Sequence, residues 1–480
     1  MLPPDEPERT EPTSPPMEWA LVVIWCDAEP ERLGEVMAMP KGQSTVAELG
    51  RGPGHPSGPP RLEPVRPRPG VDEPALPLGL RGVSRSQLRL RRRSAGGLAV
   101  ENIGRCALLV NGAVQREANV GAGDVLELRQ QIAWLCVRRP RPLPPVRDFP
   151  MARHLRFGHA DALHLVGESP AAWELRERIA FSSAREGHVL VLGESGTGKE
   201  LAARGIHVLS NRGRNRLVSR SAATLPEGLI DAELFGNAAN YPNPGMKERP
   251  GLIGQADGGT LFLDEIGELP GPLQTHLLRV LDSDGEYQRL GEAKSRRSNL
   301  RFVAATNRPL TDLKDDFGAR FPLRLRVPSL DERREDIPLL ARHLLLGIAR
   351  EDSTLRERFF DTTTEGVSTP RLDPALITAL VRHDYSLNIR ELLAALWSAL
   401  ASSTGDRILL TPEVEIAAPE TDEREQSYVK PDQLDPAAVQ AVLDANDGMQ
   451  EKAWRELGLK NRFVLIRYIR KHGLVVKRSE

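Results

Sequence analysis

A glycine-rich run at residues 193–200 reads Gly-Glu-Ser-Gly-Thr-Gly-Lys-Glu and directly follows the apolar run Val189–Leu192. Glycines let backbone N–H groups approach phosphate oxygens, and the N-terminus of a following helix adds the positive end of its dipole. Lys199 can then reach the terminal phosphates of a nucleotide. A glycine turn that binds nothing is the alternative. The pattern favours a nucleoside triphosphate site lined by Gly193, Glu194, Ser195, Gly196, Thr197, Gly198, Lys199 and Glu200.

Two adjacent carboxylates, Asp264 and Glu265, end a second apolar run. At the end of a strand, one acid can hold Mg²⁺ while the next polarises a water molecule for attack on the γ-phosphate of ATP. A third predicted strand, in the segment 301–308, ends in polar residues that include Thr306 and Asn307, and these polar groups could sense the γ-phosphate. An acidic turn without chemistry is the alternative, which the phosphate loop upstream makes less favourable.

These residues require strands that end at one edge of a sheet. From about residue 157, apolar runs alternate with helical patterns, which predicts a parallel sheet covered by helices. The N-terminal third has short apolar runs separated by Gly, Asn and Pro, which predicts a β-rich domain. The predicted segments are a disordered tail at 1–18, the β-rich domain at 19–137, a Pro/Arg linker at 138–156 that holds domains apart, the α/β subdomain at 157–330, a lid at 331–405 that is helical throughout, a polar linker at 406–433 and a helical end at 434–480.

The composition is that of a soluble globular protein. The 480 residues are 40% hydrophobic and 27% charged, with a net charge of −1, and this length allows about three domains. The apolar run Ala20–Cys26 is too short to span a bilayer, and acidic residues precede it where a signal peptide would carry basic ones. The three cysteines show no metal-ligand spacing. We therefore expect a reduced, cytoplasmic protein with no membrane partner.

The last thirty residues are basic, with nine Lys or Arg against three Glu. Two short helical patterns are joined near Gly458, and the second one, 461–471, carries the basic residues. This arrangement predicts a helix-turn-helix whose second helix could enter the major groove of DNA, with a solvated basic tail as the alternative. Its apolar residues, among them Leu465 and Ile469, are expected to form core contacts. The candidate DNA contacts are Lys460, Asn461, Arg462, Arg467 and Arg470.

Seven motifs together resemble the AAA+ domain of sigma-54-dependent transcriptional activators, the bacterial enhancer-binding proteins. The resemblance spans about residues 160–405. In that family the phosphate loop ends in Glu, as it does here at Glu200. The motifs are Leu165–Glu168, Gly193–Glu200, Glu233–Gly236, Gln255–Pro270, Ala304–Arg308, Glu332–Pro338 and Asn388–Leu392.

The resemblance implies an ATPase that uses Mg²⁺ and assembles into a ring, commonly a hexamer. Lys199 would bind phosphates, Asp264 would hold the metal and Glu265 would activate water. Thr306 and Asn307 would form the first sensor of the γ-phosphate.

Four further residues acquire roles from the same resemblance. Arg390 matches the second sensor, and Arg320 matches an arginine finger that reaches into the neighbouring subunit's site. The other finger position is Lys314, which keeps the charge but loses planar bidentate geometry. Ser221 stands where the family usually has an Asn that holds the catalytic glutamate, and a hydroxyl has a shorter reach. We therefore expect slow hydrolysis.

The loop with which the family grips sigma-54 has an altered sequence in this chain. The family reads Gly-Ala-Phe-Thr-Gly-Ala, whereas residues 240–245 read Asn-Tyr-Pro-Asn-Pro-Gly. Pro242 and Asn243 replace the contacting Phe and Thr, and Tyr241 offers an aromatic ring one position away. Because proline fixes φ and lacks an N–H donor, the loop is expected to follow a different path.

The N-terminal domain resembles a forkhead-associated (FHA) domain, a β-sandwich that reads phosphothreonine. The resemblance rests on Leu49–Arg51, Val83–Leu88, Asn102–Gly104, Val110–Gly112 and Gly121–Leu128. It implies that Arg51, Ser84 and Arg85 bind a phosphate. Gln87 replaces the family's supporting His, and Cys106 stands at the position of its central Asn. A sandwich used only for protein docking, or for restraining the ATPase, is the alternative.

These features predict a multidomain protein with an FHA-like β-sandwich, an α/β AAA+ P-loop domain with a helical lid, and an all-α end resembling the Fis-type helix-turn-helix of the same activators. The leading hypothesis is an ATP-dependent transcriptional regulator that binds an upstream DNA site and acts on RNA polymerase with sigma-54. A protein phosphorylated on threonine is the expected partner of the sandwich. The alternatives are a regulator of the same architecture that acts without sigma-54, an AAA+ remodelling ATPase, and a scaffold that binds ATP without hydrolysing it.

Overall fold

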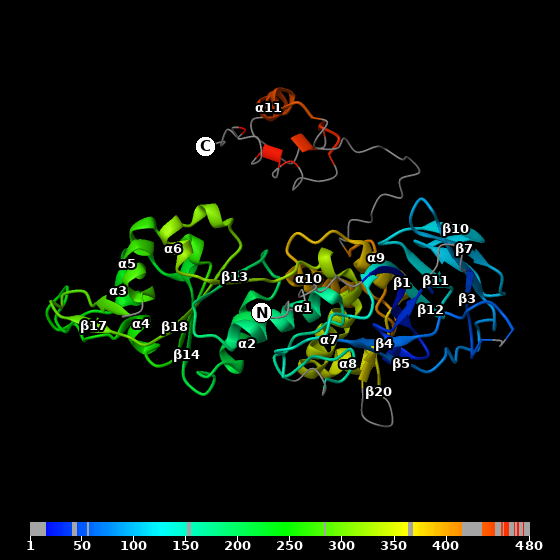
Figure 1. Ribbon diagram of the computed structural model, residues 1–480, viewed down its shortest axis with the longest axis horizontal. Helices are drawn as coiled ribbons and strands as arrows, with labels where there is room; N and C mark the ends of the chain where they lie inside the picture. The colour runs from blue at the N-terminus through cyan, green and yellow to red at the C-terminus, as the bar shows by residue number, and fades with distance from the viewer. Residues whose placement is uncertain are drawn as a thin grey trace, which may run out of the picture. The chain divides into compact units, whose positions relative to one another are not determined.

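The structure is a computed structural model whose residues form two compact units, a main unit (1–417) and a C-terminal unit (418–480). Figure 1 traces both along the chain. The residues that the structure describes are 16–40, 46–54, 57–150, 155–282, 285–362, 368–414 and 434–446, together with Ala453, Trp454, Glu456–Leu459, Leu465, Tyr468, Ile469 and Leu474.

The N-terminal part of the main unit is a β-sandwich, which confirms the predicted β-rich domain. The larger sheet has the order β5 (Val71–Pro74), β4 (Val65–Arg68), β2 (Val36–Ala38), β1 (Met17–Cys26), β12 (Ile132–Pro140), β11 (Val125–Leu128), β8 (Leu108–Val110), β9 (Ala113–Gln115). The smaller sheet has the order β10 (Glu117–Val120), β7 (Leu98–Asn102), β6 (Leu88–Arg92), β3 (Val46–Leu49). Along β6, Leu88 and Leu90 are buried and Arg89 is exposed, as expected for a strand with one face in a core. Strand β1 begins inside the segment predicted as a disordered tail.

The central subdomain contains a five-stranded parallel sheet, as predicted. Its order is β14 (Leu217–Ser221), β15 (Thr260–Asp264), β18 (Arg301–Thr306), β13 (Val189–Leu192), β19 (Leu323–Arg326). The helices are α1 (Pro170–Ser183), α2 (Lys199–Leu209), α3 (Ile230–Phe235), α4 (Gly251–Gln255), α5 (Gly271–Leu281) and α6 (Asp315–Ala319). Val189 and Val191 pack in a core with α1 and α2, whereas Leu190 packs in a second core with α3, α4 and α5. Burial on both faces explains why the central strands β13, β15 and β18 are almost continuously apolar.

Within its described residues, the lid begins with a 3₁₀ segment and contains four helices and one antiparallel pair of strands. The elements are η7 (Asp331–Asp336), α7 (Ile337–Glu351), α8 (Ser353–Phe359), β20 (Phe360–Thr362), β21 (Ser368–Pro370), α9 (Pro374–Arg382) and α10 (Ile389–Ser402). The prediction of helix throughout the lid is therefore wrong at the antiparallel β20–β21 pair. The sequence there carries several Thr together with Gly and Pro, which disfavour a helix interior.

The segment 138–156 is predicted to be an extended linker, but its described residues at 138–150 fold onto the domains that it joins. Strand β12 continues into it, and Arg139 is buried. Leu143 and Phe149 lie in the same core as α1 and α2. Burying a large apolar side chain stabilises a fold by about 1.5–3 kcal/mol, so these two residues offset much of the cost of ordering the segment.

The C-terminal unit contains helix α11 (Pro436–Ala445), whose first turn is capped by the Asp435 carboxylate. Leu465 and Ile469 are buried in the same core as this helix, as predicted. The predicted DNA contacts lie outside the described residues. They are Lys460, Asn461, Arg462, Arg467 and Arg470.

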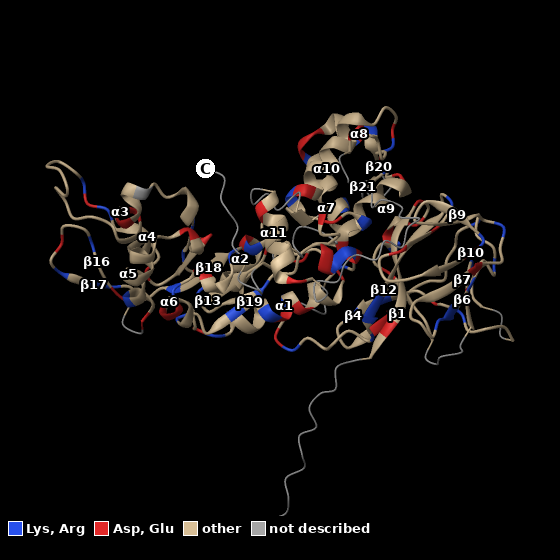
Figure 2. Cartoon of the chain, turned by 90° about the horizontal axis from the view of Figure 1, so that it is seen from above, with Lys and Arg blue, Asp and Glu red and all other residues tan. Residues whose placement is uncertain are grey.

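Charges of both signs are interspersed over the elements of the main unit (Figure 2). The basic block of the sequence lies instead in the last thirty residues. None of the helices within the described part of the chain is long and apolar enough to cross a membrane.

Candidate functional site

The phosphate loop, residues 193–198, joins β13 to α2. Gly196 and Gly198 have φ angles of +77° and +101°, which glycine adopts without side-chain strain. A Cβ atom at Gly196 would lie 2.1 Å from the carbonyl oxygen of Leu387 in the lid. Glycine therefore allows both the turn of the loop and the close approach of the lid backbone.

Lys199 begins α2, and its ammonium group folds back over the loop. The Nζ atom donates hydrogen bonds to the carbonyl oxygens of Gly193 and Glu194, at 3.1 and 3.0 Å. Burial lowers the pKa of Lys199, and the carboxylates of Asp264 and Glu265 act in the opposite direction. The structure thus brings the predicted lysine and the predicted acid pair into one electrostatic environment.

The ends of four strands, β13, β14, β15 and β18, meet at the edge of the sheet where the phosphate loop begins. Ser221 lies opposite Asp264 in the β14–β15 ladder, and Thr306 lies opposite Leu192 in the β13–β18 ladder. The amide of Gly193 donates a hydrogen bond of 3.3 Å to the carbonyl oxygen of Thr306. This carboxyl edge is where parallel α/β sheets generally bind ligands.

Glu265 follows β15 in a left-handed backbone conformation, with a φ of +53°. Its amide donates a hydrogen bond of 2.9 Å to the Asp264 carboxylate. A non-glycine residue in this conformation costs about 1–2 kcal/mol, and such strain clusters at functional sites. This hydrogen bond and the left-handed backbone of Glu265 define the local geometry of the acid pair at the end of β15.

The lid reaches the phosphate loop through Asn388, a motif residue to which the sequence resemblance assigns no role. Its side chain is fully buried, and its Nδ2 atom donates to the Glu194 carboxylate and to the carbonyl oxygen of Ser195, both at 3.1 Å. Its Oδ1 atom accepts a hydrogen bond of 2.8 Å from the amide of Leu330. Arg390 donates to the Ser195 hydroxyl at 3.0 Å, so the predicted second sensor also touches the loop.

Arg333 is a second contact that sequence reasoning missed. This buried side chain donates a hydrogen bond of 3.2 Å to the carbonyl oxygen of Thr197. Five of its neighbours within the 331–336 segment are also charged, so nothing in the sequence distinguishes it from them.

Two predicted residues of the site face solvent. Glu200 forms an ion pair of 2.9 Å with Arg204 on the exposed side of α2, with 55% of its side chain exposed. Asn307 is exposed at the end of β18.

The two finger candidates flank α6 near the surface. The Lys314 ammonium donates a hydrogen bond of 2.8 Å to the Thr275 hydroxyl. Arg320 forms an ion pair of 3.0 Å with Asp282, and 46% of its side chain is exposed. A residue that completes a neighbouring subunit's site must be accessible, and both positions meet that requirement.

Within the part of the chain that the structure describes, no group of three or more His, Cys, Asp or Glu side chains is placed to hold a metal ion. Asp264 and Glu265 form only a pair. At nucleotide sites Mg²⁺ is usually bound by one or two carboxylates together with substrate phosphates, so this donor set fits a metal that binds with its nucleotide.

The altered loop at 240–245 is folded against the segment that follows the short strand β16 (Glu286–Gln288). The amide of Ala238 donates a hydrogen bond of 2.9 Å to the carbonyl oxygen of Leu290. A Cβ atom at Gly291 would lie 2.3 Å from the ring of Tyr241, so this ring rests directly on the glycine backbone. Tyr241 is 41% exposed, which leaves an aromatic surface available at the loop.

In the sandwich, the loops that carry Arg51, Ser84 and Arg85 are tied together. The amide of Arg51 donates a hydrogen bond of 2.9 Å to the carbonyl oxygen of Ser84. The buried Gln87 accepts from the amide of Ser84 at 3.0 Å and donates to the carbonyl oxygen of Cys106 at 2.8 Å. Gln87 therefore does the bridging expected of a supporting residue.

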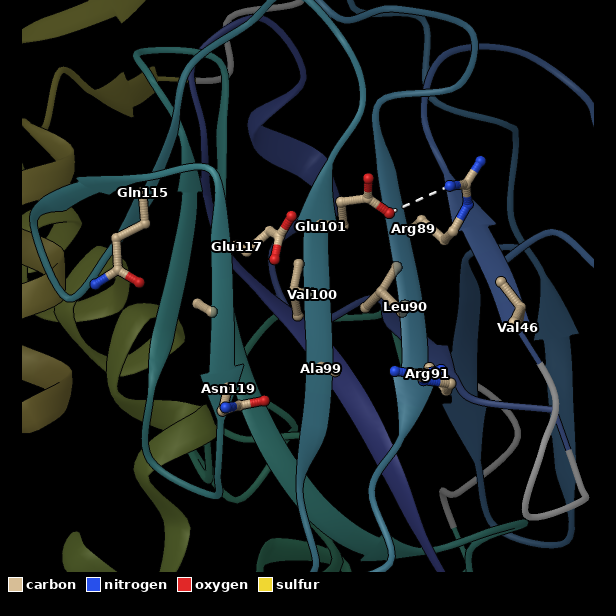
Figure 3. A pocket seen from close by; sticks show the side chains of 11 residues that line it. Val46, Arg89, Leu90, Arg91, Ala99, Val100, Glu101, Gln115, Glu117 and Asn119 are labelled. Carbon is tan, nitrogen blue, oxygen red and sulfur yellow. Dashed lines mark hydrogen bonds and ion pairs between the residues drawn. The ribbon is translucent and has the colours of Figure 1, made fainter.

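A hollow of about 710 Å³ lies on the outer face of the smaller sheet of the sandwich (Figure 3). Its charged residues include Arg89, which pairs with Glu101 at 3.2 Å. The hollow is open and polar, and none of the predicted site residues lines it. We assign no chemistry to it.

The parallel sheet, the phosphate loop and the lid that contacts it define an AAA+ P-loop domain. Residues 165–330 match the family described as the Sigma-54 interaction domain. The transcriptional regulatory protein ZraR of Escherichia coli (strain K12) is 35% identical over 321 residues, which are 65% of this chain and 69% of that protein. The chain belongs to the family of sigma-54-dependent transcriptional activators.

Two further proteins are similar to a comparable share of the chain. The Nif-specific regulatory protein of Azotobacter vinelandii is 36% identical over 342 residues, which are 66% of this chain and 60% of that protein. The crystal structure of NtrX from Brucella abortus in complex with ADP has 27% sequence identity and a TM-score of 0.46. The match covers 65% of this chain and 70% of that one.

The contact between Gly196 and the lid can be tested by comparing two glycines. Gly196→Ala should lower the free energy of unfolding by about 2–4 kcal/mol, because a left-handed alanine costs about 1–2 kcal/mol and overpacking adds a similar amount. Gly198→Ala should show only the first cost, since open space surrounds that position. Urea unfolding of the full chain measures both, and equal losses would contradict a close approach of the lid.

Proposed function

We propose that the protein is a transcriptional regulator whose AAA+ domain binds and hydrolyses ATP. One observation carries this proposal: several predicted site residues lie around one phosphate loop. They are Lys199, the acid pair 264–265 and Thr306, and Asn388 of the lid contacts the same loop. Family membership supports the role in transcription.

The residues of the chain have separate roles in this proposal. The backbone amides of the phosphate loop and Lys199 would bind the phosphates, and Glu265 would orient water and accept its proton. Ser221, opposite Asp264 at the sheet edge, would hydrogen-bond the acid pair. Mg²⁺, when bound by Asp264 and the phosphates, would neutralise charge on the transferring group.

Lys314 and Arg320 would act in a neighbouring subunit, so the active form would be a ring, commonly a hexamer in this family. Their exposure supports this role, and the lysine at the first position supports slow turnover. The C-terminal unit would bind an upstream DNA site through its basic residues, and RNA polymerase would be the target of the ring.

Turnover of ATP tests the catalytic assignment. Glu265→Gln should reduce kcat by about 100-fold or more while ADP still binds, because general-base catalysis typically contributes at least this factor. Lys199→Ala should weaken nucleotide binding itself. Glu174→Gln, the same chemical change at an exposed residue of α1, should leave both unchanged. Unaltered turnover in Glu265→Gln would exclude Glu265 as the general base, whereas a wild type that binds ADP and shows no ATP turnover would favour the scaffold that binds ATP without hydrolysing it.

The second candidate function is a regulator that acts without sigma-54. It is favoured by one observation: residues 240–245 lack the family's Phe and Thr, and Tyr241 rests on Gly291. If the protein does act with sigma-54, we infer that the Tyr241 ring takes the place of the family's phenylalanine as the contact.

Retention of sigma-54 on immobilised full-length protein, with ADP and a metal fluoride present, separates the two candidates. If Tyr241 is the contact, the wild type retains sigma-54, and Tyr241→Ala loses at least about tenfold in affinity, as for loss of an aromatic anchor. Leu229→Ala, at another exposed apolar residue, is the control. No retention by a wild type that hydrolyses ATP would establish the sigma-54-independent alternative.

We further propose that Arg51, Ser84 and Arg85 bind a phosphothreonine peptide. Two contacts between the loops support this role. The amide of Arg51 donates to the carbonyl oxygen of Ser84, and Gln87 accepts from the amide of Ser84. Arg51→Ala should weaken binding of a phosphothreonine peptide by about tenfold or more, since a hydrogen bond to a charged group contributes about 1.5–3 kcal/mol. Arg91→Ala on the outer face of the sheet should have no effect. Fluorescence anisotropy measures the binding. If the unphosphorylated peptide binds as tightly as the phosphorylated one, the sandwich does not read phosphothreonine and serves only for protein docking.

A further inference from the structure

The sandwich and the lid share one hydrophobic core. One cluster of buried side chains contains residues from both parts. The sandwich contributes Trp25 of β1, Leu33 and Leu135 of β12, and the lid contributes Leu339 of α7 and Ile377 of α9. The strands β1 and β12 lie beside the lid helices in Figure 1. The indole Nε1 of Trp25 also donates a buried hydrogen bond of 2.9 Å to the carbonyl oxygen of Leu372. The sandwich and the lid are therefore joined by one shared set of buried apolar side chains rather than by a contact between two exposed surfaces.

A buried ion pair lies at the edge of this core. The guanidinium of Arg139, at the end of β12, lies 2.7 Å from the carboxylate of Glu335, and the two side chains are 5% and 10% exposed. The other terminal nitrogen of Arg139 donates to the carbonyl oxygen of Glu168 at 3.4 Å. Burial raises the pKa of Glu335 to about 7, and Arg139 acts in the opposite direction. Such a pair fixes the relative position of two elements because either charge alone would be unfavourable there.

Glu335 belongs to η7, and Arg333 of the same segment reaches the phosphate loop. Arg333 donates a hydrogen bond to the carbonyl oxygen of Thr197 at 3.2 Å. The carboxylate of Asp336 accepts from the amides of Glu168 and Ser169, at 2.7 and 2.9 Å. Arg333 has non-helical φ and ψ angles of −136° and 45°, so η7 contains a kink. One six-residue segment thus contacts the sandwich on one side and the phosphate loop on the other.

We propose that Arg139 is a positioning residue of the ATPase, which fixes η7 and thereby couples occupancy of the phosphate loop to the order of strand β12 in the sandwich. The inference rests on the proposed nucleotide site. Coupling between two sites is reciprocal in free energy, so a ligand that stabilises or distorts β12 changes nucleotide affinity by the same factor. The sandwich can then control the ATPase without contacting the nucleotide.

Hydrogen exchange of the full-length protein with and without ADP tests this coupling. In the wild type, ADP should slow exchange of the β12 amides by about fivefold or more, the lower end of coupling between linked sites. Replacing Arg139 alone leaves a buried carboxylate and can prevent folding, so the informative variant is Arg139→Met combined with Glu335→Met, which removes both charges. In this double variant the effect of ADP on β12 should fall below about twofold while protection of the phosphate loop persists.

The control is Arg138→Met, the same change at the exposed neighbouring residue of β12, which should retain the wild-type effect. Binding of a fluorescent ADP analogue to each sample reports the nucleotide site separately. If the wild type binds ADP without any change in β12, or if the double variant keeps the full effect, the coupling is overturned. A wild type that does not bind ADP would overturn the proposed nucleotide site and this inference with it.

Discussion

The side-chain amide of Asn388 holds the phosphate loop and the lid in one arrangement, and the nucleotide site depends on this contact. It is fully buried, and its three hydrogen bonds go to Glu194, Ser195 and Leu330. A buried amide must satisfy its donors and its acceptor together, so the loop, the lid and the start of η7 are held at the same time. The glycine at 196 leaves the space that this approach requires.

The parallel sheet provides the rigid base for that contact. Its central strands, β13, β15 and β18, are buried on both faces, and alternate residues of β13 belong to two separate cores. Shifting this strand would expose apolar side chains on both faces at once, so the position of the phosphate loop at its end is strongly determined. The catalytic candidates at 221, 264 and 306 end neighbouring strands and share this constraint.

The sandwich extends the same arrangement by a different kind of interaction. The ion pair of Arg139 with Glu335 contributes little net stability, because desolvation of both charges opposes their attraction. Its physical effect is to select one orientation of η7 relative to β12. The contact between Tyr241 and Gly291 also fixes a position. The ring rests on the glycine backbone and defines where the loop at 240–245 lies, without a large buried surface.

The sequence by itself determined the parallel sheet, the phosphate loop and the strand ends at 264 and 306, because apolar runs and glycine spacing are local signals. It also predicted the β-rich domain. It did not predict that the segment 138–156, expected to be an extended linker, contains the buried Arg139. The helical pattern of the flanking residues led to a prediction of helix through β20 and β21, although the Thr, Gly and Pro residues of this short segment disfavour a helix. Only the tertiary structure decided that Asn388 meets Glu194 and that Arg333 meets Thr197, contacts across 194 and 136 residues of chain. A buried polar side chain leaves no periodic pattern in the sequence, and its partner is defined only when distant segments have packed.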